Sequence, residues 1–150
     1  LTRDFSIDVS PVRSPDERRI AFVSNRSGSP QIYIMDADGA NVRRLTYLGN
    51  YNTSPAWSPK GKKIAYEGSV NGGFQIFVID AEGGDPQQLT FEAGDHESPS
   101  WSPDGRYLAY SVRGYGRSRI EIMNAGGQGV RVLHEDKEAS QSPFWSPHLR

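Results

Sequence analysis

The sequence contains no cysteine and no excess of charge of either sign. Without thiols, disulfide bonds and cysteine-ligated zinc sites are excluded, although a protein without cysteine is compatible with either side of a membrane. The 17 Lys and Arg residues nearly balance the 18 Asp and Glu residues. Because these charges are also interspersed, nucleic acid or another polyanion is not expected as a partner.

Long apolar segments are missing as well. A helix needs roughly 18 consecutive apolar residues to cross a bilayer, and no run in this sequence approaches that length. We therefore expect no membrane insertion. The sequence opens on Leu1 without a signal peptide, so any targeting segment is expected on a longer precursor.

The motifs of several enzyme classes are absent too. The sequence has no Gly-x-Ser-x-Gly elbow and no phosphate-binding Gly-Lys-Ser/Thr loop. Its histidines, His96, His134 and His148, fall at different positions of the repeat described below and form no His-Glu-x-x-His pair. We expect no catalytic residues, no cofactor and no bound metal.

What the sequence does contain is a tandem repeat. The dipeptide Ser-Pro recurs at a constant interval of 44 residues, beginning at Ser14, Ser58, Ser102 and Ser146. Aligned without insertion or deletion, the chain divides into repeats 14–57, 58–101 and 102–145, with partial repeats 1–13 and 146–150. A strand-rich repeat of roughly 40 to 50 residues is typical of a propeller blade, which cannot bury both faces of its sheet without neighbours.

Each repeat predicts a second, a third and an outer strand of a blade. The second strands, with a small Ala between larger apolar residues, are expected at 19–23, 63–66 and 107–111. The third strands, rich in β-branched and aromatic residues, are expected at 31–35, 75–79 and 119–123. After a glycine-containing turn, short polar outer strands are expected at 42–46, 86–90 and 130–134. No long helix is expected.

The innermost strand of each blade is expected to end at Trp57, Trp101 or Trp145. Proline lies two residues before and two residues after each Trp, which is tolerated where one edge of a strand faces a channel unpaired. The identical register of the three Trp favours packing between blades over stacking on a ligand. Arg13 stands at the Trp position of the first repeat and Glu17 at a turn glycine position, so the first blade is expected to pack less well.

The segment Ser98–Tyr110, with Ser-Pro-x-Trp-Ser-Pro-Asp-Gly before a strand, resembles the TolB-type propeller repeat, and the resemblance covers the whole chain. The segment Ser142–Arg150 is similar to the C-terminal end of that family. The resemblance implies an all-β fold of about three four-stranded antiparallel blades, the C-terminal half of a six-bladed ring, without the family's α/β domain. It also implies a non-enzymatic periplasmic protein of the Tol-Pal cell-envelope system, with the peptidoglycan-associated lipoprotein and some colicins as partners.

Candidate binding residues lie on the loops from each outer strand to the next inner strand, which open at the mouth of the channel. These loops, 47–53, 91–97 and 135–141, are the most divergent parts of the repeat. The candidates are Asn50, Tyr51, Asn52, Thr53, Asp95, His96, Glu97, Ser140 and Gln141. Thr53, Glu97 and Gln141 share one repeat position and are the best contacts for the lipoprotein, although each alone is equally explained as a solvated loop residue.

Two further hypotheses concern the channel and the ends of the array. Asp95, Glu97 and Glu138 approach the channel mouth and together provide the oxygen ligands of a hard cation, but solvated charge is the favoured interpretation. Three blades do not close a ring, so the end blades would expose apolar faces. The remaining half of the propeller on another polypeptide, or a second copy forming a homodimer, is expected to cover them.

Two alternative functions stay open. One is the regulatory propeller of a serine oligopeptidase-like enzyme, which requires a hydrolase domain after the propeller. The other is a purely structural half-propeller completed by self-association. In a ring of two copies, residues 10–13 of one copy and 142–145 of the other would compete for the same inner-strand place.

Overall fold

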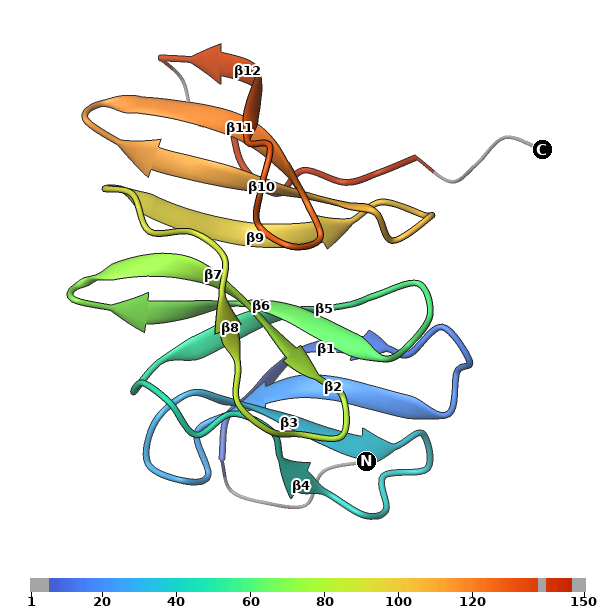
Figure 1. Ribbon diagram of the computed structural model, residues 1–150. Coiled ribbons are helices and arrows are strands. Elements are labelled where there is room, and N and C mark those ends of the chain that lie inside the picture. Colours follow the sequence, from blue (N-terminus) through green and yellow to red (C-terminus); the bar gives the residue numbers. More distant parts are fainter. Residues whose placement is uncertain (1–5, 138–139, 147–150) are drawn as a thin grey trace.

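The computed structural model describes residues 6–137 and 140–146. In this part of the chain, all the regular secondary structure consists of β-strands. The strands form three four-stranded antiparallel sheets, each built from strands consecutive in the chain. Figure 1 shows the sheets stacked in chain order, with β1–β4 at one end and β9–β12 at the other. Within the described residues, no helix is long and apolar enough to cross a membrane.

The strands of each sheet, from inner to outer, are as follows. The first sheet comprises β1 (Asp8–Arg13), β2 (Arg19–Ser24), β3 (Gln31–Asp36) and β4 (Arg43–Arg44). The second comprises β5 (Asn52–Trp57), β6 (Lys63–Val70), β7 (Gly73–Asp80) and β8 (Gln87–Gln88). The third comprises β9 (Asp95–Trp101), β10 (Tyr107–Gly114), β11 (Arg117–Asn124) and β12 (Arg131–Asp136). The predicted all-β fold of four-stranded antiparallel blades is confirmed.

The inner strands contain a β-bulge at each Ser-Pro step. Ser10, Ser54 and Ser98 have φ of 52°, 52° and 55°, and the pairing with the second strand shifts register at this point in each sheet. A bulge leaves one residue outside the hydrogen-bonded ladder, so the proline that follows costs no ladder bond. The bulge, together with the open edge, explains why proline recurs inside a strand.

The prediction of an inner strand at Ser142–Trp145 is wrong, because the described residues include no second strand with which it could pair. The segment nevertheless has the local geometry of an inner strand. Ser142 has a φ of 52°, like the bulged serines, and the indole N–H of Trp145 donates to the Ser100 carbonyl at 3.0 Å. Contact with the neighbouring blade therefore positions this segment without any strand pairing.

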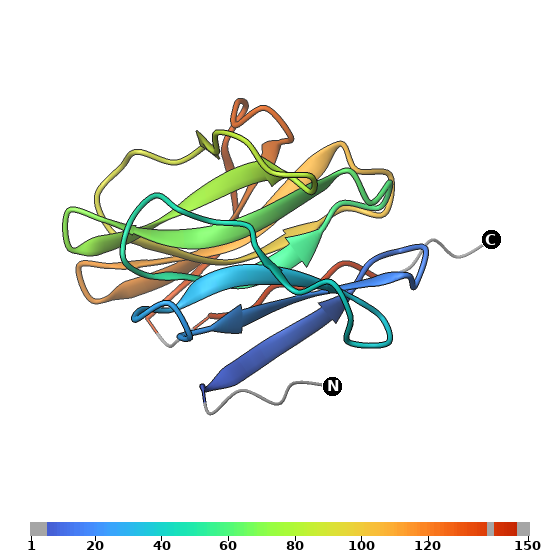
Figure 2. The same cartoon turned by 90° about the horizontal axis from the view of Figure 1, so that it is seen from below.

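The blades pack face to face through a repeated tryptophan contact. The indole N–H of Trp57 donates to the Val12 carbonyl at 3.1 Å, and that of Trp101 donates to the Ala56 carbonyl at 3.1 Å. Between the first two sheets lie the buried side chains of Ala21, Ile32, Ile34, Leu45, Ile64, Tyr66, Ile79 and Ala81. Between the second and third lie those of Ala65, Ile76, Val78, Leu89, Leu108, Tyr110, Val112 and Met123. Figure 2 shows the same stack of sheets from below.

The turn between the first and second strands is built around a serine hydroxyl. The Ser102 hydroxyl donates to Asp104 Oδ1 at 2.6 Å and accepts the N–H of Tyr107 at 2.9 Å. Asp104 also accepts the N–H and the side-chain Nε–H of Arg106. These hydrogen bonds, that from Ser102 above all, hold the pKa of the Asp104 carboxyl far below its usual value.

The first of these turns lacks the glycine that the other two have. Glu17 has a φ of 60°, close to the 67° of Gly61 and the 71° of Gly105 at the same repeat position. A residue with a Cβ pays a steric cost in this left-handed region. The first turn therefore keeps its shape at a cost in backbone strain, and its inner strand β1 is also mostly exposed, as expected for the first blade.

Replacing Glu17 by Gly should relieve this strain. We expect the free energy of unfolding to rise by about 1 kcal/mol, because left-handed backbone destabilises an L-residue by roughly this amount. Urea denaturation measures the change. Glu17→Ala removes the same ion pair with Arg13 but keeps the strain, so an equal gain in both variants would contradict the explanation.

The Asp104 turn predicts a pH-dependent contribution to stability. Because the carboxyl pKa is lower in the folded chain, its contribution is present above the unfolded pKa of about 3.9 and is lost as the pH falls toward the folded pKa. Asp104→Ala should therefore lower the thermal midpoint at pH 7, with a smaller difference from wild type at more acidic pH. Lys60→Ala, at the same repeat position, is the control and should show no such trend.

Candidate functional site

Two kinds of connection meet on one face of the blades, which we call the loop face. It comprises the loops 47–51 and 91–94 from an outer strand to the next inner strand, and the tips of the second-to-third strand hairpins, 25–30, 71–72 and 115–116. The N–H of Asn52 donates to the Pro30 carbonyl and the N–H of Ser69 to the Tyr51 carbonyl, both at 2.9 Å. Loops and hairpins of neighbouring blades are thus bonded into one surface.

The candidate residues lie on or just below this face and differ in their exposure. Asn50, Tyr51 and Gln141 are exposed, whereas Thr53, Asp95, Glu97 and Ser140 are half-buried. Asn52 and His96 are each only 2% exposed. The sequence therefore located the loops, but two of its candidate contacts are not accessible to a partner.

Asn52 fixes the loop before it to the first sheet. Its side-chain amide donates to Gln31 Oε1 at 2.9 Å and to the Leu48 carbonyl at 2.8 Å. Gln31 Oε1 also accepts the Thr46 hydroxyl at 2.8 Å. Both side-chain N–H groups of Asn52 are therefore used inside the protein.

His96 has the same repeat position and a similar internal role. Its Nδ1 lies 3.2 Å from the Gly94 carbonyl, and its ring is 5.9 Å from that of Tyr110. Burial lowers the pKa of His96, so the ring is neutral at pH 7. It supports the 91–94 loop from below.

Ser140 completes the pattern at the third occurrence of this position. Its N–H donates to the Ser118 hydroxyl at 2.8 Å, and that hydroxyl donates back to the Ser140 carbonyl at 2.7 Å. Positions 52, 96 and 140 therefore anchor the loops. The next residues along the chain are more accessible: Gln141 is exposed, and Thr53 and Glu97 are half-buried. We call Thr53, Glu97 and Gln141 the row of presented side chains.

Sequence reasoning missed two charged residues beside this row. Arg113 of β10 places Nη2 3.0 Å from Glu97 Oε1 and 3.6 Å from Asp95 Oδ2. Below them, Glu67 of β6 is 8% exposed and accepts the N–H of Ser98 at 2.8 Å. Burial raises the pKa of the Glu67 carboxyl, and the hydrogen bond from Ser98 opposes that rise.

A signal for Glu67 was present in the repeat alignment. The equivalent residues of the neighbouring repeats are Val23 and Ser111. Glu67 is therefore the one carboxylate among these three equivalent residues. Glu67 connects the second blade to the bulge of the third, just inside the row of presented side chains. Its partners depend on the blades being side by side, which the alignment alone does not describe.

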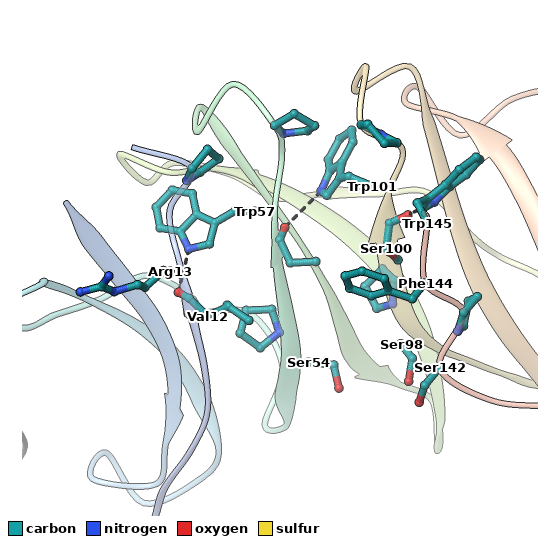
Figure 3. A pocket seen from close by; sticks show the side chains of 17 residues that line it. Val12, Arg13, Ser54, Trp57, Ser98, Ser100, Trp101, Ser142, Phe144 and Trp145 are labelled. Atoms are coloured by element: carbon teal, nitrogen blue, oxygen red, sulfur yellow. Dashed lines mark hydrogen bonds between the residues drawn. The ribbon is translucent and has the colours of Figure 1, made fainter. Parts of the chain in front are cut away.

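The inner strands and residues 142–145 line an apolar groove of about 840 Å³, whose walls include Ser54, Ser98 and Ser142, the residues that follow this row. Figure 3 shows its walls, made by the three Ser-Pro-x-Trp segments that end at Trp57, Trp101 and Trp145, together with Val12 and Arg13 of the first inner strand. Phe144, which is 92% exposed, also lines it. An apolar groove with a charged and polar mouth can bind a protein segment. Among the described residues that line it, no nucleophile is paired with a base.

No group of three or more metal-ligating side chains occurs in the part of the chain that the structure describes. Of the three carboxylates considered for a cation, Glu138 lies outside the described residues. The other two, Asp95 and Glu97, both face the guanidinium of Arg113, which already supplies the positive charge at this place.

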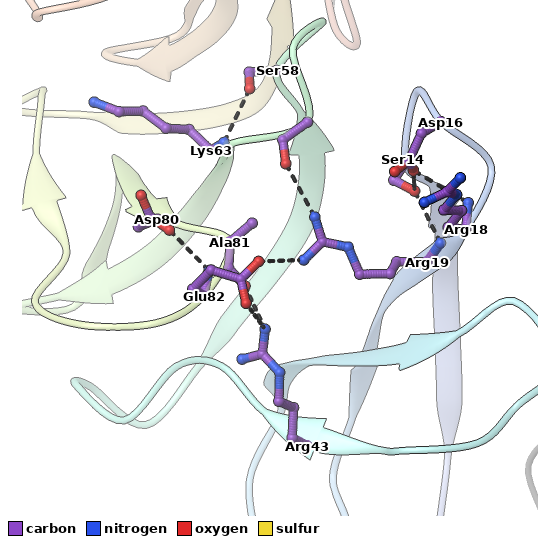
Figure 4. A network of polar contacts seen from close by, with 11 residues as sticks. Ser14, Asp16, Arg18, Arg19, Arg43, Ser58, Lys63, Asp80, Ala81 and Glu82 are labelled. Carbon is purple, nitrogen blue, oxygen red and sulfur yellow. Dashed lines mark hydrogen bonds and ion pairs between the residues drawn. The ribbon is translucent and has the colours of Figure 1, made fainter.

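The opposite face, formed by the remaining turns, has an ion-pair network of a different kind (Figure 4). Arg19 of the first blade donates to Glu82 of the second at 2.6 Å and lies over the Trp57 ring at 5.0 Å. Arg43 lies 3.7 Å from the same carboxylate. This network joins two blades and is separate from the loop face.

Comparison with known proteins agrees with this architecture. Over 50 residues, 31% of this chain, the sequence is 49% identical to the Tol-Pal system protein TolB of Geobacter sulfurreducens, of which the match covers 12%. The crystal structure of TolB from Acinetobacter baumannii superposes with a TM-score of 0.84 at 33% identity, over 98% of this chain and 37% of that one. An acylaminoacyl peptidase from Pyrococcus horikoshii matches with a TM-score of 0.65 at 17% identity, which shows the fold alone.

The chain spans well under half the length of these two TolB proteins. The model of the TolB β-propeller domain matches residues 1–149. The chain therefore belongs to the TolB β-propeller domain family.

Proposed function

We propose that this chain is a non-enzymatic, protein-binding propeller of the Tol-Pal cell-envelope system, acting in the periplasm and binding the peptidoglycan-associated lipoprotein through its loop face. One observation carries the proposal. In a chain of the TolB family, the row of presented side chains, Thr53, Glu97 and Gln141, directly precedes the serines that line an apolar groove, while the residues before the row hold each loop in place.

The composition of the loop face supports a protein partner. Protein interfaces combine an apolar centre with a polar rim, and here the groove supplies the apolar part while Glu97, Asp95 and Arg113 supply the rim. Tyr51, 43% exposed, packs edge-on against Phe74 with 5.5 Å between ring centroids. A face whose loops are already bonded to the blades loses little conformational entropy on binding.

The same surface is the natural place for colicins, which the family resemblance names as further partners. A colicin segment that binds the groove mouth should compete with the lipoprotein for Thr53, Glu97 and Gln141. The regulatory propeller of a serine oligopeptidase gains no support from the site, since the likeness to the peptidase propeller shows the fold alone.

The outward face of the third blade supports the proposal that further blades complete the ring. Leu133 is 59% exposed, whereas Leu45 and Leu89 at the same repeat position are 2% and 5% exposed beneath a neighbouring blade. A blade of the same family, from a longer polypeptide or a second copy, would bury this leucine as the others are buried.

The lipoprotein proposal predicts binding that depends on the presented row. The probe is the soluble part of the peptidoglycan-associated lipoprotein of Geobacter sulfurreducens, measured by titration calorimetry. Glu97→Ala should weaken binding about tenfold, as expected for an interface contact worth about 1.4 kcal/mol. Glu82→Ala removes a carboxylate that pairs with an arginine on the opposite face and should leave binding unchanged.

Failure of the folded wild-type protein to bind the lipoprotein would refute the proposal. Equal losses in the Glu97 and Glu82 variants would show that the effect comes from stability and not from contact.

Ring completion predicts self-association when the chain is isolated. Light scattering should give twice the mass of one chain, because the apolar end faces favour burial. Leu133→Asp should shift the population toward the monomer. A monomer at all concentrations would exclude the second copy as the covering partner and leave the separate polypeptide.

A further inference from the structure

The most exposed aromatic side chain of the described loop face is at a hairpin tip. Tyr115, between β10 and β11, is 92% exposed. Within the described residues, its side chain makes no hydrogen bond or ring contact. Packing in this chain therefore does not account for the presence of a large aromatic residue here.

The backbone at Tyr115 is also unfavourable for tyrosine. Its φ is 52°, in the left-handed region, and Gly116 follows with a φ of 74°. The equivalent hairpin of the second blade has Asn71 with a φ of 50° and Gly72 with a φ of 84°. Asn and Gly are the preferred residues of such a two-residue turn, whereas a bulky residue there is an outlier. Asn would therefore fit this turn as well as Tyr or better.

The base of this hairpin packs beside the row of presented side chains. A Cβ on Gly94 would lie 3.0 Å from the Arg113 carbonyl oxygen, and one on Gly114 would lie 3.4 Å from the Gly94 Cα. The hairpin base and the 91–94 loop are thus in direct contact. The ion pair between Arg113 and Glu97, at 3.0 Å, joins the same hairpin to the groove mouth.

A second exposed aromatic lies next to this hairpin. Phe91, 75% exposed, lines a hollow of about 780 Å³ together with Arg113, Gly114 and Asp95. Phe91 and Gly114 therefore border one depression, with Tyr115 directly following Gly114. A partner surface that reaches from the groove mouth to the tip would pass over this hollow.

We infer that Tyr115 is an anchor residue for a folded protein partner, and that its ring enters an apolar pocket of that partner beside the groove mouth. The inference rests on the proposed function, because it extends the contact surface of the lipoprotein outward along the loop face. Tyrosine is enriched among the residues that dominate binding energy, and its two rotatable bonds cost little entropy to fix. The packed base of the hairpin lowers that cost further.

The charges around the hairpin tip favour a protein, and not a membrane surface, as the binding partner of Tyr115. Arg113 pairs with Glu97, and Arg117 pairs with Glu135 at 2.7 Å. Their positive charges are therefore offset locally, whereas recruitment by an anionic bilayer needs an excess of Lys and Arg together with a broad apolar surface. Tyr115 at the hairpin tip and Phe91 beside the hollow are two single exposed rings and do not provide that surface.

The experiment compares Tyr115→Asn, Tyr115→Phe and wild type for binding to the soluble part of the Geobacter sulfurreducens lipoprotein. Tyr115→Asn should weaken binding at least tenfold while its thermal midpoint stays the same or rises, because Asn suits the left-handed turn. Tyr115→Phe should bind within about threefold of wild type, since the ring and not the hydroxyl enters the pocket. Opposite changes in stability and binding are not expected from a purely structural role.

Asn71→Tyr, the same change at the equivalent tip of the second blade, is the matched control and should not restore binding to Tyr115→Asn. Equal affinity of wild type and Tyr115→Asn would overturn the inference while leaving the proposed function intact. No binding by wild type would overturn both. Sedimentation with vesicles of anionic phospholipid that depended on Tyr115 would assign the residue to a membrane and also overturn the inference.

Discussion

A four-stranded blade has apolar side chains on both faces, so its stability depends on its neighbours. In this chain one contact recurs at both junctions between the described blades: an inner-strand tryptophan packs against the preceding blade and donates its indole N–H to a carbonyl of the preceding inner strand. Trp145 makes the same bond to Ser100 without lying in a strand. The contact satisfies the only polar atom of a large apolar side chain. It also sets the distance and angle at which the next blade begins, on which every loop position depends.

The loop face follows from this regular packing. Because the blades are held in register, residues at one repeat position occupy equivalent places, and chemistry can differ between positions without disturbing the frame. Asn52, His96 and Ser140 are chemically unlike one another, yet each bonds its loop to the blade below. The side chains next to them are thereby free to differ, as partner-specific contacts require.

Several features of the sequence predicted the structure well, and their success has a physical basis. The period of 44 residues, the Ala-centred second strands and the recurring Trp each report on backbone pairing or packing that is repeated in every blade. The exception at Ser142–Trp145 has the same basis, because a strand requires a partner strand as well as a suitable sequence. The left-handed backbone at Ser142 and the Trp145 contact are present without one.

The sequence alone determined the fold class, the order of strands and the loops that carry the candidate site, because these depend on short-range pattern and on repetition. It did not distinguish Asn52 and His96, which are buried, from Thr53 and Glu97, which are presented, since adjacent polar residues look alike until the strand assigns them to opposite sides. Only the tertiary structure placed Arg113 between Asp95 and Glu97, and Glu67 beneath the neighbouring bulge. Such contacts join separate strands or blades, and their geometry is fixed by packing.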